Sequence, residues 1–523
     1  MTEARLWTGG RIFTGRRYVE ALLVDQGAVV AAGTESEVRR SAPTGTEIQP
    51  LEGRLILPGL IDAHLHVPEL ARSREGLNLT EVRGLDDLLR RVREWGAAHP
   101  VGTIVGRGLD IERSLGGRWP GREDLDRCVR DRPLVLYHAS GHAAIGNSVA
   151  LEEAGVDSRP EVELPGRVGR GSDGRANGIL YEEALRWLAP LAASVSDPAA
   201  VRRTLEFLAS LGLSAIATMN TSPEDLLVLR SMAVGDRLPI RMRVYVRLLR
   251  IEEFLPKDLQ PTGRPGRFAV VGAKGFTDGA FGPRTAWLSE PYADGSGGSG
   301  VAVESDKTLA EALASADRLG LVPALHAIGD RAVVRAARLL VPYVRSEGPI
   351  ARIEHVGLTP PAVLHLLETV RPALVIQPGF VWSDYWLTER LGPTRTRWAY
   401  AFRTLADQGH LLVGSSDAPY DPADPWRGIR AATDRRDALG RSANPDPRET
   451  LGVEEAVGLY TQAAGRVLGE PRLGSLEAGA RADLLVLSAR NLAGAVRDGA
   501  ASVRETWVDG ARVFPSGGAT GAQ

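Results

Sequence analysis

The sequence contains a single cysteine, Cys128, among its 523 residues. One thiol excludes an internal disulfide bond and any metal site built from several thiolates. Ligands for a metal ion must therefore come from imidazole and oxygen atoms. The nine histidines are then the residues to follow along the chain.

The sequence also lacks a long apolar run and an excess of charge of one sign. No window approaches the roughly 20 apolar residues of a membrane span, and the start MTEARLWTGGRIF has no basic segment followed by an apolar one. The 63 basic and 65 acidic residues are mixed throughout, which gives a formal net charge of −2. We therefore expect a cytoplasmic protein that acts on a small molecule, with neither a membrane nor a nucleic acid as its partner.

The two ends of the chain share a pattern of short strands and tight turns. ARLWTGGRIFTG and ALLVDQGAVVAAG near the start, and ADLLVLSA and VRETWVDGARVF near the end, are apolar segments that Gly-containing corners interrupt or bound. Neither end has enough strands to stand alone. We predict that residues 1–57 and 470–523 pair into one small composite β-sandwich.

The middle of the chain, residues 58–469, alternates compact apolar runs with helical periodicity. Eight runs have the character of strands covered on both faces: LILPGLIDAHLH, SAIATM, RMRVYVRL, FAVVGAKGFTDG, LVPALHAI, ARIEHV, ALVIQPGF and LLVGSSDAP. Repeated strand and helix units predict an α/β fold, here a TIM (β/α)₈ barrel. Two further runs, TIVGRGLD and LVLYHASGH, would make ten, so we place an insertion at roughly residues 70–200.

Four histidines stand at the ends of these runs. His64 and His66 in IDAHLH are two residues apart, so their side chains point to one face of the strand. His326 in LVPALHAIGD and His355 in ARIEHV repeat the arrangement. Barrel enzymes build their sites at the carboxyl ends of the strands. One such histidine is usually a hydrogen-bonded core residue, but four at equivalent positions favour metal coordination.

Asp417 and Lys274 end two further runs. Asp417 in LLVGSSDAP is either a turn or cap residue, or a carboxylate that binds metal and accepts a proton from an activated water. Lys274 in FAVVGAKGFTDG either pairs with Asp278 or is buried with a lowered pKa. In the second case the neutral amine captures carbon dioxide, and the carbamate bridges two cations as a long carboxylate.

The order of these segments resembles the amidohydrolase superfamily, specifically the amidohydrolase-3 or YtcJ-like branch that includes N-substituted formamide deformylase. The resemblance covers nearly the whole chain through LPGLIDAHLH, RWPGREDLD, YHASGHAAIGNSVALEEAGV, GILYEEA, AKGFTDGAFGPRTAWL, HAIGDRAV, RIEHV, GSSDAP and GSLEAGARADLLVL. It implies a TIM barrel with a composite sandwich, and suggests a homodimer. It also implies a metal site formed by His64, His66, Lys274 as a carbamate, His326, His355 and Asp417.

The resemblance further implies a hydrolase that cleaves a non-peptide C–N bond, an amide-like bond of a small molecule, with one or two divalent metal ions. Zinc is the metal we expect, although the same ligands also accept iron, manganese or cobalt. We expect a metal-activated water to attack the carbonyl while Asp417 carries the proton to the leaving nitrogen. His326 or His355 would help to hold the oxyanion.

Three more residues are candidates for substrate binding, each with a plainer alternative. The resemblance suggests that His142 in YHASGHAAIGN faces the substrate; the alternative is a structural hydrogen bond. Arg284 in AFGPRTAW either binds a substrate carboxylate from a lid or is simply exposed. Trp382 either stacks on an apolar substrate or packs in the core.

Two other functions stay open. A mononuclear deaminase of a purine-like or amidine substrate shares the HxH barrel, but it typically has an HAxE-type glutamate where this sequence has AIGD after His326. It also needs no lysine at the position of Lys274. A non-catalytic scaffold of the same fold would usually have lost metal ligands, whereas all six positions here keep competent side chains. Both alternatives are therefore less favoured than the hydrolase.

Overall fold

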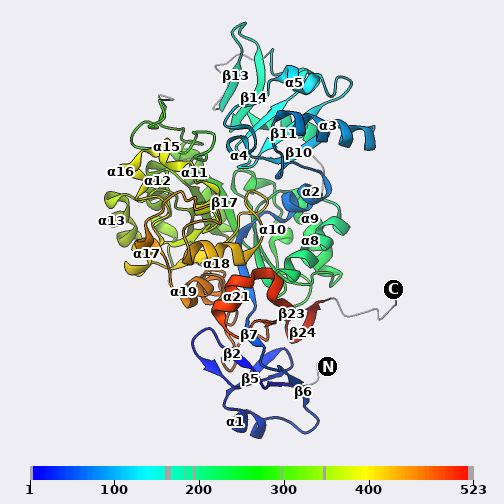
Figure 1. The fold of residues 1–523 in the computed structure, drawn as a ribbon, viewed down its shortest axis with the longest axis vertical. Coiled ribbons are helices and arrows are strands. Elements are labelled where there is room, and N and C mark those ends of the chain that lie inside the picture. The colour runs from blue at the N-terminus through cyan, green and yellow to red at the C-terminus, as the bar shows by residue number, and fades with distance from the viewer. Residues whose placement is uncertain are drawn as a thin grey trace.

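The computed structural model describes residues 4–158, 166–182, 184–192, 196–295, 298–345 and 349–515. Three parts follow one another along the long axis of the molecule (Figure 1). A small sheet with its helices lies at the top, a barrel in the middle and two sheets from the chain ends at the bottom.

Eight parallel strands form the barrel. Their order is β21-β20-β19-β18-β17-β16-β15-β8, so each barrel strand pairs with the next barrel strand along the chain. They are β8 (Leu60–Leu65), β15 (Leu213–Thr221), β16 (Arg241–Arg247), β17 (Phe268–Phe276), β18 (Val322–Ala327), β19 (Arg352–His355), β20 (Ala373–Ile376) and β21 (Leu412–Gly414). The predicted TIM-barrel class is confirmed, and each of the eight predicted runs supplies one barrel strand.

Backbone hydrogen bonds between the first and last strand ends bring the two edges of the barrel together. The N–H of Asp417 donates to the carbonyl of His64 at 2.7 Å, and the N–H of His66 donates to the carbonyl of Ala418 at 2.8 Å. The segment after β21 and the end of β8 are therefore held side by side at the barrel mouth.

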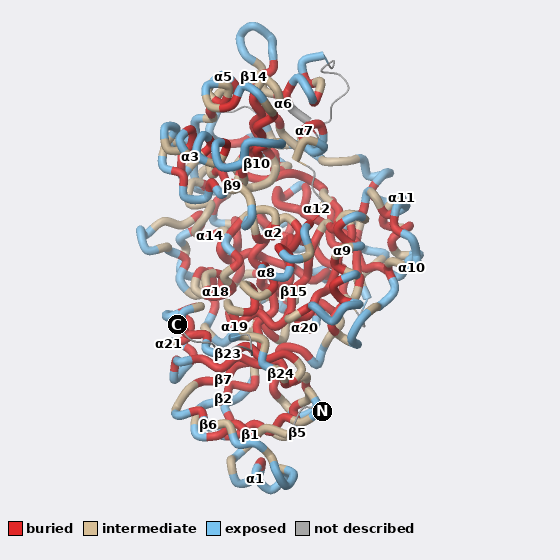
Figure 2. The backbone as a smooth tube through the Cα atoms, turned by 90° about the vertical axis from the view of Figure 1, so that its right-hand side faces the viewer, coloured by how far each residue is buried: buried red, intermediate tan, exposed pale blue. Residues whose placement is uncertain are grey.

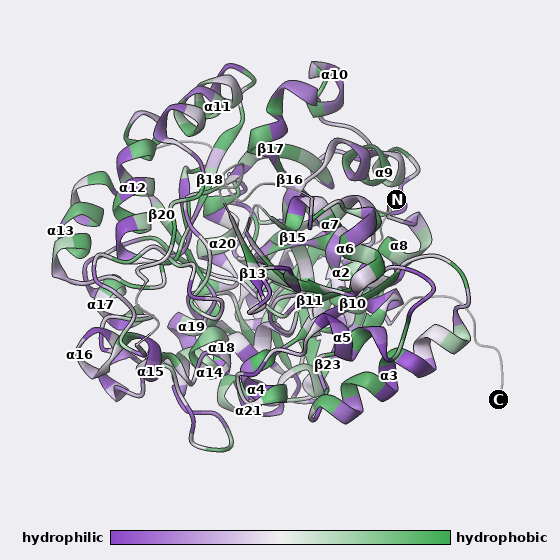
Figure 3. Cartoon of the chain, turned by 90° about the horizontal axis from the view of Figure 1, so that it is seen from above, coloured by the Kyte–Doolittle hydropathy of each residue, from purple (hydrophilic) through white to green (hydrophobic). Residues whose placement is uncertain are grey.

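Helices cover the barrel because each buries an apolar stripe. In α12 (Asp330–Leu340) the buried Val333, Ala336, Ala337 and Leu340 recur at intervals of three and four residues. The others around the barrel are α2 (Val67–Glu75), α8 (Pro198–Ser210), α9 (Pro223–Val234), α10 (Pro256–Leu259), α11 (Asp306–Arg318), α13 (Pro361–Val370), α17 (Phe402–Asp407), α18 (Pro425–Thr433), α19 (Val453–Leu459) and α20 (Gln462–Val467). Figure 2 shows the buried residues concentrated along the strands, and Figure 3 shows helices with mixed hydropathy around them.

Short helical segments make up several of the connections. Three lie between β20 and β21: α14 (Phe380–Ser383), α15 (Leu387–Leu391) and α16 (Pro393–Thr396). The 3₁₀ turns are η2 (Leu248–Glu253), η3 (Val341–Tyr343), η4 (Pro447–Glu449) and η5 (Gly499–Ser502). Within the described ranges, no helix combines the length and apolar content that crossing a membrane requires.

Between β8 and β15 the chain builds a separate sheet of order β13-β14-β12-β11-β10-β9. Its strands are β9 (Leu77–Asn78), β10 (Ile104–Leu109), β11 (Leu134–His138), β12 (Ala143–Gly146), β13 (Gly166–Arg170) and β14 (Ala176–Glu182). The helices of this part are α3 (Leu85–Ala98), α4 (Ile111–Leu115), α5 (Arg122–Asp126), α6 (Ser148–Glu153) and α7 (Leu185–Ala192). TIVGRGLD and LVLYHASGH supply β10 and β11, and we propose this sheet as the body of the insertion.

Two sheets at the other end pack on a shared core that includes Trp7, Ile56 and Trp507. The first, of order β5-β4-β1-β6, contains β1 (Arg5–Thr8), β4 (Ala21–Asp25), β5 (Ala28–Gly33) and β6 (Glu47–Pro50). The second, of order β24-β23-β22-β7-β2-β3, contains β2 (Arg11–Phe13), β3 (Tyr18–Val19), β7 (Leu55–Pro58), β22 (Leu484–Leu487), β23 (Val503–Val508) and β24 (Ala511–Phe514). Helices α1 (Glu35–Arg40) and α21 (Leu492–Asp498) flank them.

The second sheet mixes both ends of the chain. Strand β7 pairs in parallel with β2 and antiparallel with β22. This is the composite sandwich that the sequence predicts. We propose the corresponding domain division, with 1–57 and 470–523 in the sandwich and 58–469 in the barrel domain with its insertion.

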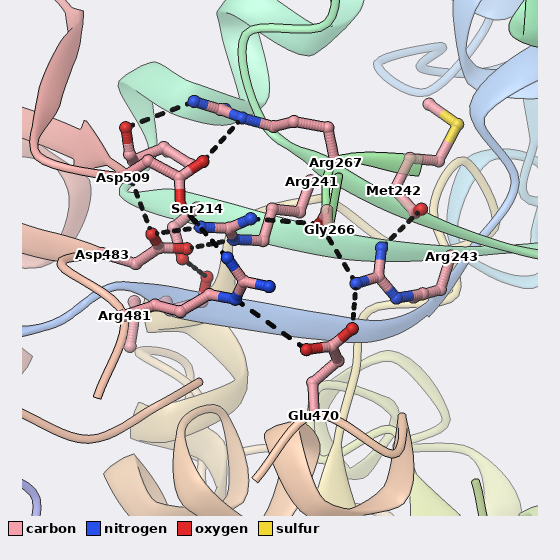
Figure 4. A network of polar contacts seen from close by, with 12 residues as sticks. Ser214, Arg241, Met242, Arg243, Gly266, Arg267, Glu470, Arg481, Asp483 and Asp509 are labelled. Carbon is pink, nitrogen blue, oxygen red and sulfur yellow. Dashed lines mark hydrogen bonds and ion pairs between the residues drawn. The ribbon is translucent and has the colours of Figure 1, made fainter. Parts of the chain in front are cut away.

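A buried ion-pair network joins the lower end of β16 to the C-terminal segment (Figure 4). Arg241 donates to Asp483 from Nε at 2.7 Å and from Nη2 at 2.9 Å, and also contacts Asp509. The side chains of Arg241 and Asp483 are 0% and 2% exposed. Arg243 pairs with Glu470. Buried charges need such partners because desolvation costs several kcal/mol per ion.

We expect the substitution Asp483→Asn to destabilise the protein by about 3 kcal/mol, because it leaves the buried Arg241 with less than its full counter-charge. The measurement is the thermal unfolding midpoint followed by circular dichroism. Glu206→Gln is the control, since the Arg202–Glu206 pair at 2.9 Å lies on the surface of α8 and should contribute less than about 1 kcal/mol. Equal midpoints for the two variants would contradict the structural role of the network.

Candidate metal centre

Three predicted ligands from distant parts of the sequence meet at the barrel mouth. His64 is on β8, His355 ends β19 and Asp417 follows β21. All three are buried, and each offers one ligand atom within 4.8 Å of those of the other two. The carboxyl ends of the strands thus gather the nitrogen and oxygen donors that suit a divalent metal.

Backbone conformation turns two of these side chains toward the centre. The φ angle is +73° at His355 and +61° at Asp417, a region that residues other than glycine rarely adopt. Glu354 points into the barrel interior, where it contacts His64. A regular strand would therefore direct the next residue, His355, outward. The left-handed conformation at the strand end removes this alternation and is a strain typical of functional sites.

His66 joins the group through Asp417. The Nε2 atoms of His64 and His66 both lie 3.1 Å from Oδ1 of Asp417. Burial by itself would raise the pKa of the Asp417 carboxyl, but the adjacent imidazoles of His64 and His66 hold it well below its usual range. Asp417 is therefore an ionised carboxylate, the form that binds a cation.

His326, on the neighbouring strand β18, lies beside His355, with the two ring centroids 4.4 Å apart. Its Nε2 hydrogen-bonds the carbonyl of Gly279 at 2.9 Å, which leaves Nδ1 as the nitrogen for a metal. Burial, with His355 and Lys274 nearby, holds the pKa of His326 well below its usual value. Burial also lowers the pKa of His355, against the pull of Asp417. Both imidazoles are then neutral, as metal ligation requires.

Lys274 is 1% exposed near the end of β17. Among the described residues its Nζ has no hydrogen-bond or ion-pair partner, and the nearest recorded contact is the Phe276 ring at 5.0 Å from the centroid. Asp278, the plainer partner considered for it, instead accepts hydrogen bonds from the N–H groups of Trp287, Ile328 and Gly329. Burial lowers the pKa of the lysine amine to about 8, against the attraction of Glu354 and Asp417.

Two buried residues that the sequence analysis missed orient the histidines. Glu354 Oε2 lies 2.5 Å from His64 Nδ1, and Gln377 Oε1 lies 2.7 Å from His355 Nδ1. A histidine held through one nitrogen in this way presents the other to a metal. Nε2 of His64 is buried and makes no hydrogen bond of regular geometry among the described residues; it lies 3.1 Å from Oδ1 of Asp417. The donor set and this buried nitrogen, which points at a carboxylate, both fit a divalent cation.

Comparison with known proteins places this site in a family. Residues 47–514 match the sequence profile of the amidohydrolase family. The chain is 30% identical to the putative amidohydrolase YtcJ of Bacillus subtilis, over 92% of this chain and 94% of that protein. The chain belongs to the amidohydrolase family.

One further relative in sequence and one solved structure are also similar to this amidohydrolase. It is 27% identical to N-substituted formamide deformylase of Arthrobacter pascens, over 90% of each chain. The crystal structure of an uncharacterised metal-dependent hydrolase from Pyrococcus horikoshii has a TM-score of 0.76 at 28% identity, and covers 93% of this chain and 98% of that one. Together these matches support a hydrolase that uses a divalent metal.

The centre of the amidohydrolase opens into a cavity of about 1380 Å³ that the insertion helps to line. His142, next to β12, hydrogen-bonds Glu182 of β14 between Nδ1 and Oε2 at 2.9 Å, and its ring lies 5.2 Å from that of His326. Burial favours the neutral imidazole, but Glu182 outweighs this and raises the pKa of His142. His142 thus faces the cavity and makes a structural hydrogen bond as well.

The other two substrate-binding candidates differ in their placement. Trp382 on α14 lines the cavity, while its Nε1 donates to the carbonyl of Asp434 at 3.0 Å. Arg284 is not among the described residues that line the cavity. Its Nε pairs with Asp294 at 2.7 Å, and its side chain is 40% exposed. The ion pair with Asp294 keeps this guanidinium away from the metal centre.

Proposed function

We propose that this amidohydrolase cleaves a non-peptide C–N bond, an amide-like bond of a small molecule. The observation that carries the proposal is the convergence of His64, His355 and Asp417 within 4.8 Å of one another at the barrel mouth. An ionised carboxylate beside neutral imidazoles is the donor set of hydrolytic metal sites.

We further propose zinc as the metal, held by His64, His66, Lys274, His326, His355 and Asp417, with Lys274 as a carbamate. A divalent cation at this position would polarise the substrate carbonyl and acidify water. Two features support the carbamate: Lys274 has no counter-charge in contact with it, and its lowered pKa supplies neutral amine near pH 8. The amine nitrogen bonds to carbon dioxide and loses one proton.

Asp417 is the residue that we assign to proton transfer. Both recorded contacts with the imidazoles of His64 and His66 are made by Oδ1, so Oδ2 is the oxygen that takes the proton of the attacking water. The same oxygen then delivers the proton to the leaving nitrogen. We assign His326 and His355 to support of the developing oxyanion through the cation that they would hold, because the second nitrogen of each ring is bonded to Gly279 or Gln377.

Substrate contacts follow from the cavity wall. We propose that His142, which Glu182 orients, and Trp382 contact the substrate, the second by stacking on an apolar group. Arg284 would take part only if its ion pair with Asp294 opened.

The test is a screen of zinc-loaded protein against N-formyl, N-acyl and cyclic amides, with N-formyl compounds first because of the deformylase relative. We expect amine release that stops on removal of the metal with a chelator and returns when zinc is added back. Metal content by elemental analysis accompanies the screen. A folded, zinc-loaded preparation that releases no amine from any compound would contradict the proposed function.

The carbamate is tested separately. Protein incubated with ¹³C-labelled bicarbonate should show a carbamate resonance by NMR, and the Lys274→Ala variant should lack it. A spectrum without this resonance in the native chain would contradict the carbamate alone and leave the hydrolase in place.

A further inference from the structure

Strand β16 carries its polar residues on one face. Arg241, Arg243, Tyr245 and Arg247 occupy alternate positions in RMRVYVR, and alternate side chains on a strand point to the same face. Tyr245 accepts a hydrogen bond from Arg352 of β19 at 3.4 Å. Strands β17 and β18 lie between these two strands in the barrel sheet, so the contact crosses the interior and identifies the face as the one that points into the barrel.

The three arginines on this face differ in their hydrogen-bond and ion-pair partners. Arg241 and Arg243, at the lower end, have the carboxylates of Asp483 and Glu470 as partners (Figure 4). Arg247, at the mouth, hydrogen-bonds only the side-chain amide of Asn220, from Nε to Oδ1 at 3.3 Å. No acidic side chain among the residues that the structure describes forms an ion pair with it.

The acidic side chains near Arg247 form ion pairs with other arginines. Glu224 pairs with Arg250 at 2.9 Å, and Glu253 also pairs with Arg250. Asp225 pairs with Arg72 at 3.1 Å. The half-buried guanidinium at the end of β16 therefore keeps N–H groups that none of the described residues engages.

Arg247 is also close to the reacting centre. It is in register with Lys274 on the neighbouring strand β17, so both side chains project to the same face, and both line the cavity. A guanidinium presents paired N–H donors that match the two oxygens of a carboxylate. Since Arg247 is fixed by its strand and by Asn220, it would hold an anionic group in one position relative to the metal centre.

We propose that Arg247 binds a carboxylate of the substrate, and that the substrates of this chain are therefore N-acylated compounds that carry a carboxylate, such as N-acyl amino acids. The inference rests on the proposed function for the bond that is cleaved, but the recognition of the anion is a separate property that can be measured without turnover.

The experiment uses two probes without a cleavable bond, 3-phenylpropionate and 3-phenylpropanol, which differ at the carboxylate. Calorimetric titration of the zinc-loaded full chain should give an affinity for the carboxylate about 10- to 100-fold higher than for the alcohol, the gain expected from a charged hydrogen bond. Arg247→Met should lose this preference, and Arg247→Lys should keep part of it. Arg202→Met on the surface of α8 is the control and should keep all of it.

The outcomes separate the two claims. Equal affinity of the native chain for both probes, or a preference that Arg247→Met retains because the metal itself binds the carboxylate, would overturn the role of Arg247. The thermal midpoint of each variant shows whether it is folded. If Arg247→Met is unfolded, Arg247→Lys takes its place, and an undiminished preference for the carboxylate in that variant would overturn the role of Arg247. Hydrolysis of N-formyl amino acids and of their primary amides is then compared. If neither is cleaved, the proposed function fails while the binding result stands.

Discussion

Replacement of Asp417 by asparagine should lower kcat by about 1000-fold or more while the bound metal is largely retained. The amide keeps the shape of the side chain and an oxygen for the cation, but it cannot take up the proton of the attacking water. Single-turnover kinetics together with elemental analysis would measure both effects on one preparation.

The matched control is Asp424→Asn, the same substitution in the segment that follows Asp417. Asp424 caps α18 by accepting a hydrogen bond from the N–H of Trp426 at 3.0 Å, and asparagine caps a helix equally well. Its kcat should therefore match that of the native chain. An active Asp417→Asn variant would exclude this carboxylate as the proton carrier.

The second large effect is expected at Glu354, which touches no substrate and positions His64. Burial by itself would raise the pKa of this carboxyl, but Arg352 and His64 hold it well below its usual range, so it is ionised. Glu354→Gln should weaken metal binding about 10- to 100-fold because Nδ1 of His64 loses its anionic partner. It should also cost about 3 to 5 kcal/mol of stability, since Arg352 then lies buried without its counter-charge.

Competition with a coloured chelator measures the metal affinity, and the thermal midpoint of the metal-free protein measures the stability. Glu368→Gln on the exposed face of α13 is the control, because its only recorded ion pair is a 3.9 Å contact with the exposed His365. A Glu354→Gln variant with native metal affinity would show that His64 can bind the metal without an anionic partner at Nδ1 to fix its tautomer and ring orientation.

The barrel could be predicted from the sequence because its strands are buried on both faces. Segments such as LVPALHAI and ALVIQPGF are then short continuous apolar runs, and helices with a clear apolar stripe separate them. The candidate ligands could be predicted from the sequence for the same reason. His64, His326 and Asp417 end such runs, and the fold brings strand ends together whatever their separation in sequence.

The residues that the sequence analysis missed act through partners far away in the chain. Glu354 stands next to His355 in ARIEHV, and only the folded chain shows that it is buried and that it contacts His64. Arg247 is one of three arginines in RMRVYVR, and nothing local distinguishes the two that have carboxylate partners. For Arg284 the sequence leaves a substrate carboxylate and simple exposure open, and its Gly-rich segment does not reveal Asp294 as its partner.

Strand β7 has one neighbour from each end of the chain, and this sets the order in which the molecule can be completed. Its residues Leu55–Pro58 pair with Leu484–Leu487, so a nascent chain carries an open strand edge until the whole barrel has left the ribosome. A product of premature termination before Leu484 would keep that edge exposed, ready to pair with other chains or to be recognised by chaperones. Closure of the sandwich therefore requires that translation has passed Leu487.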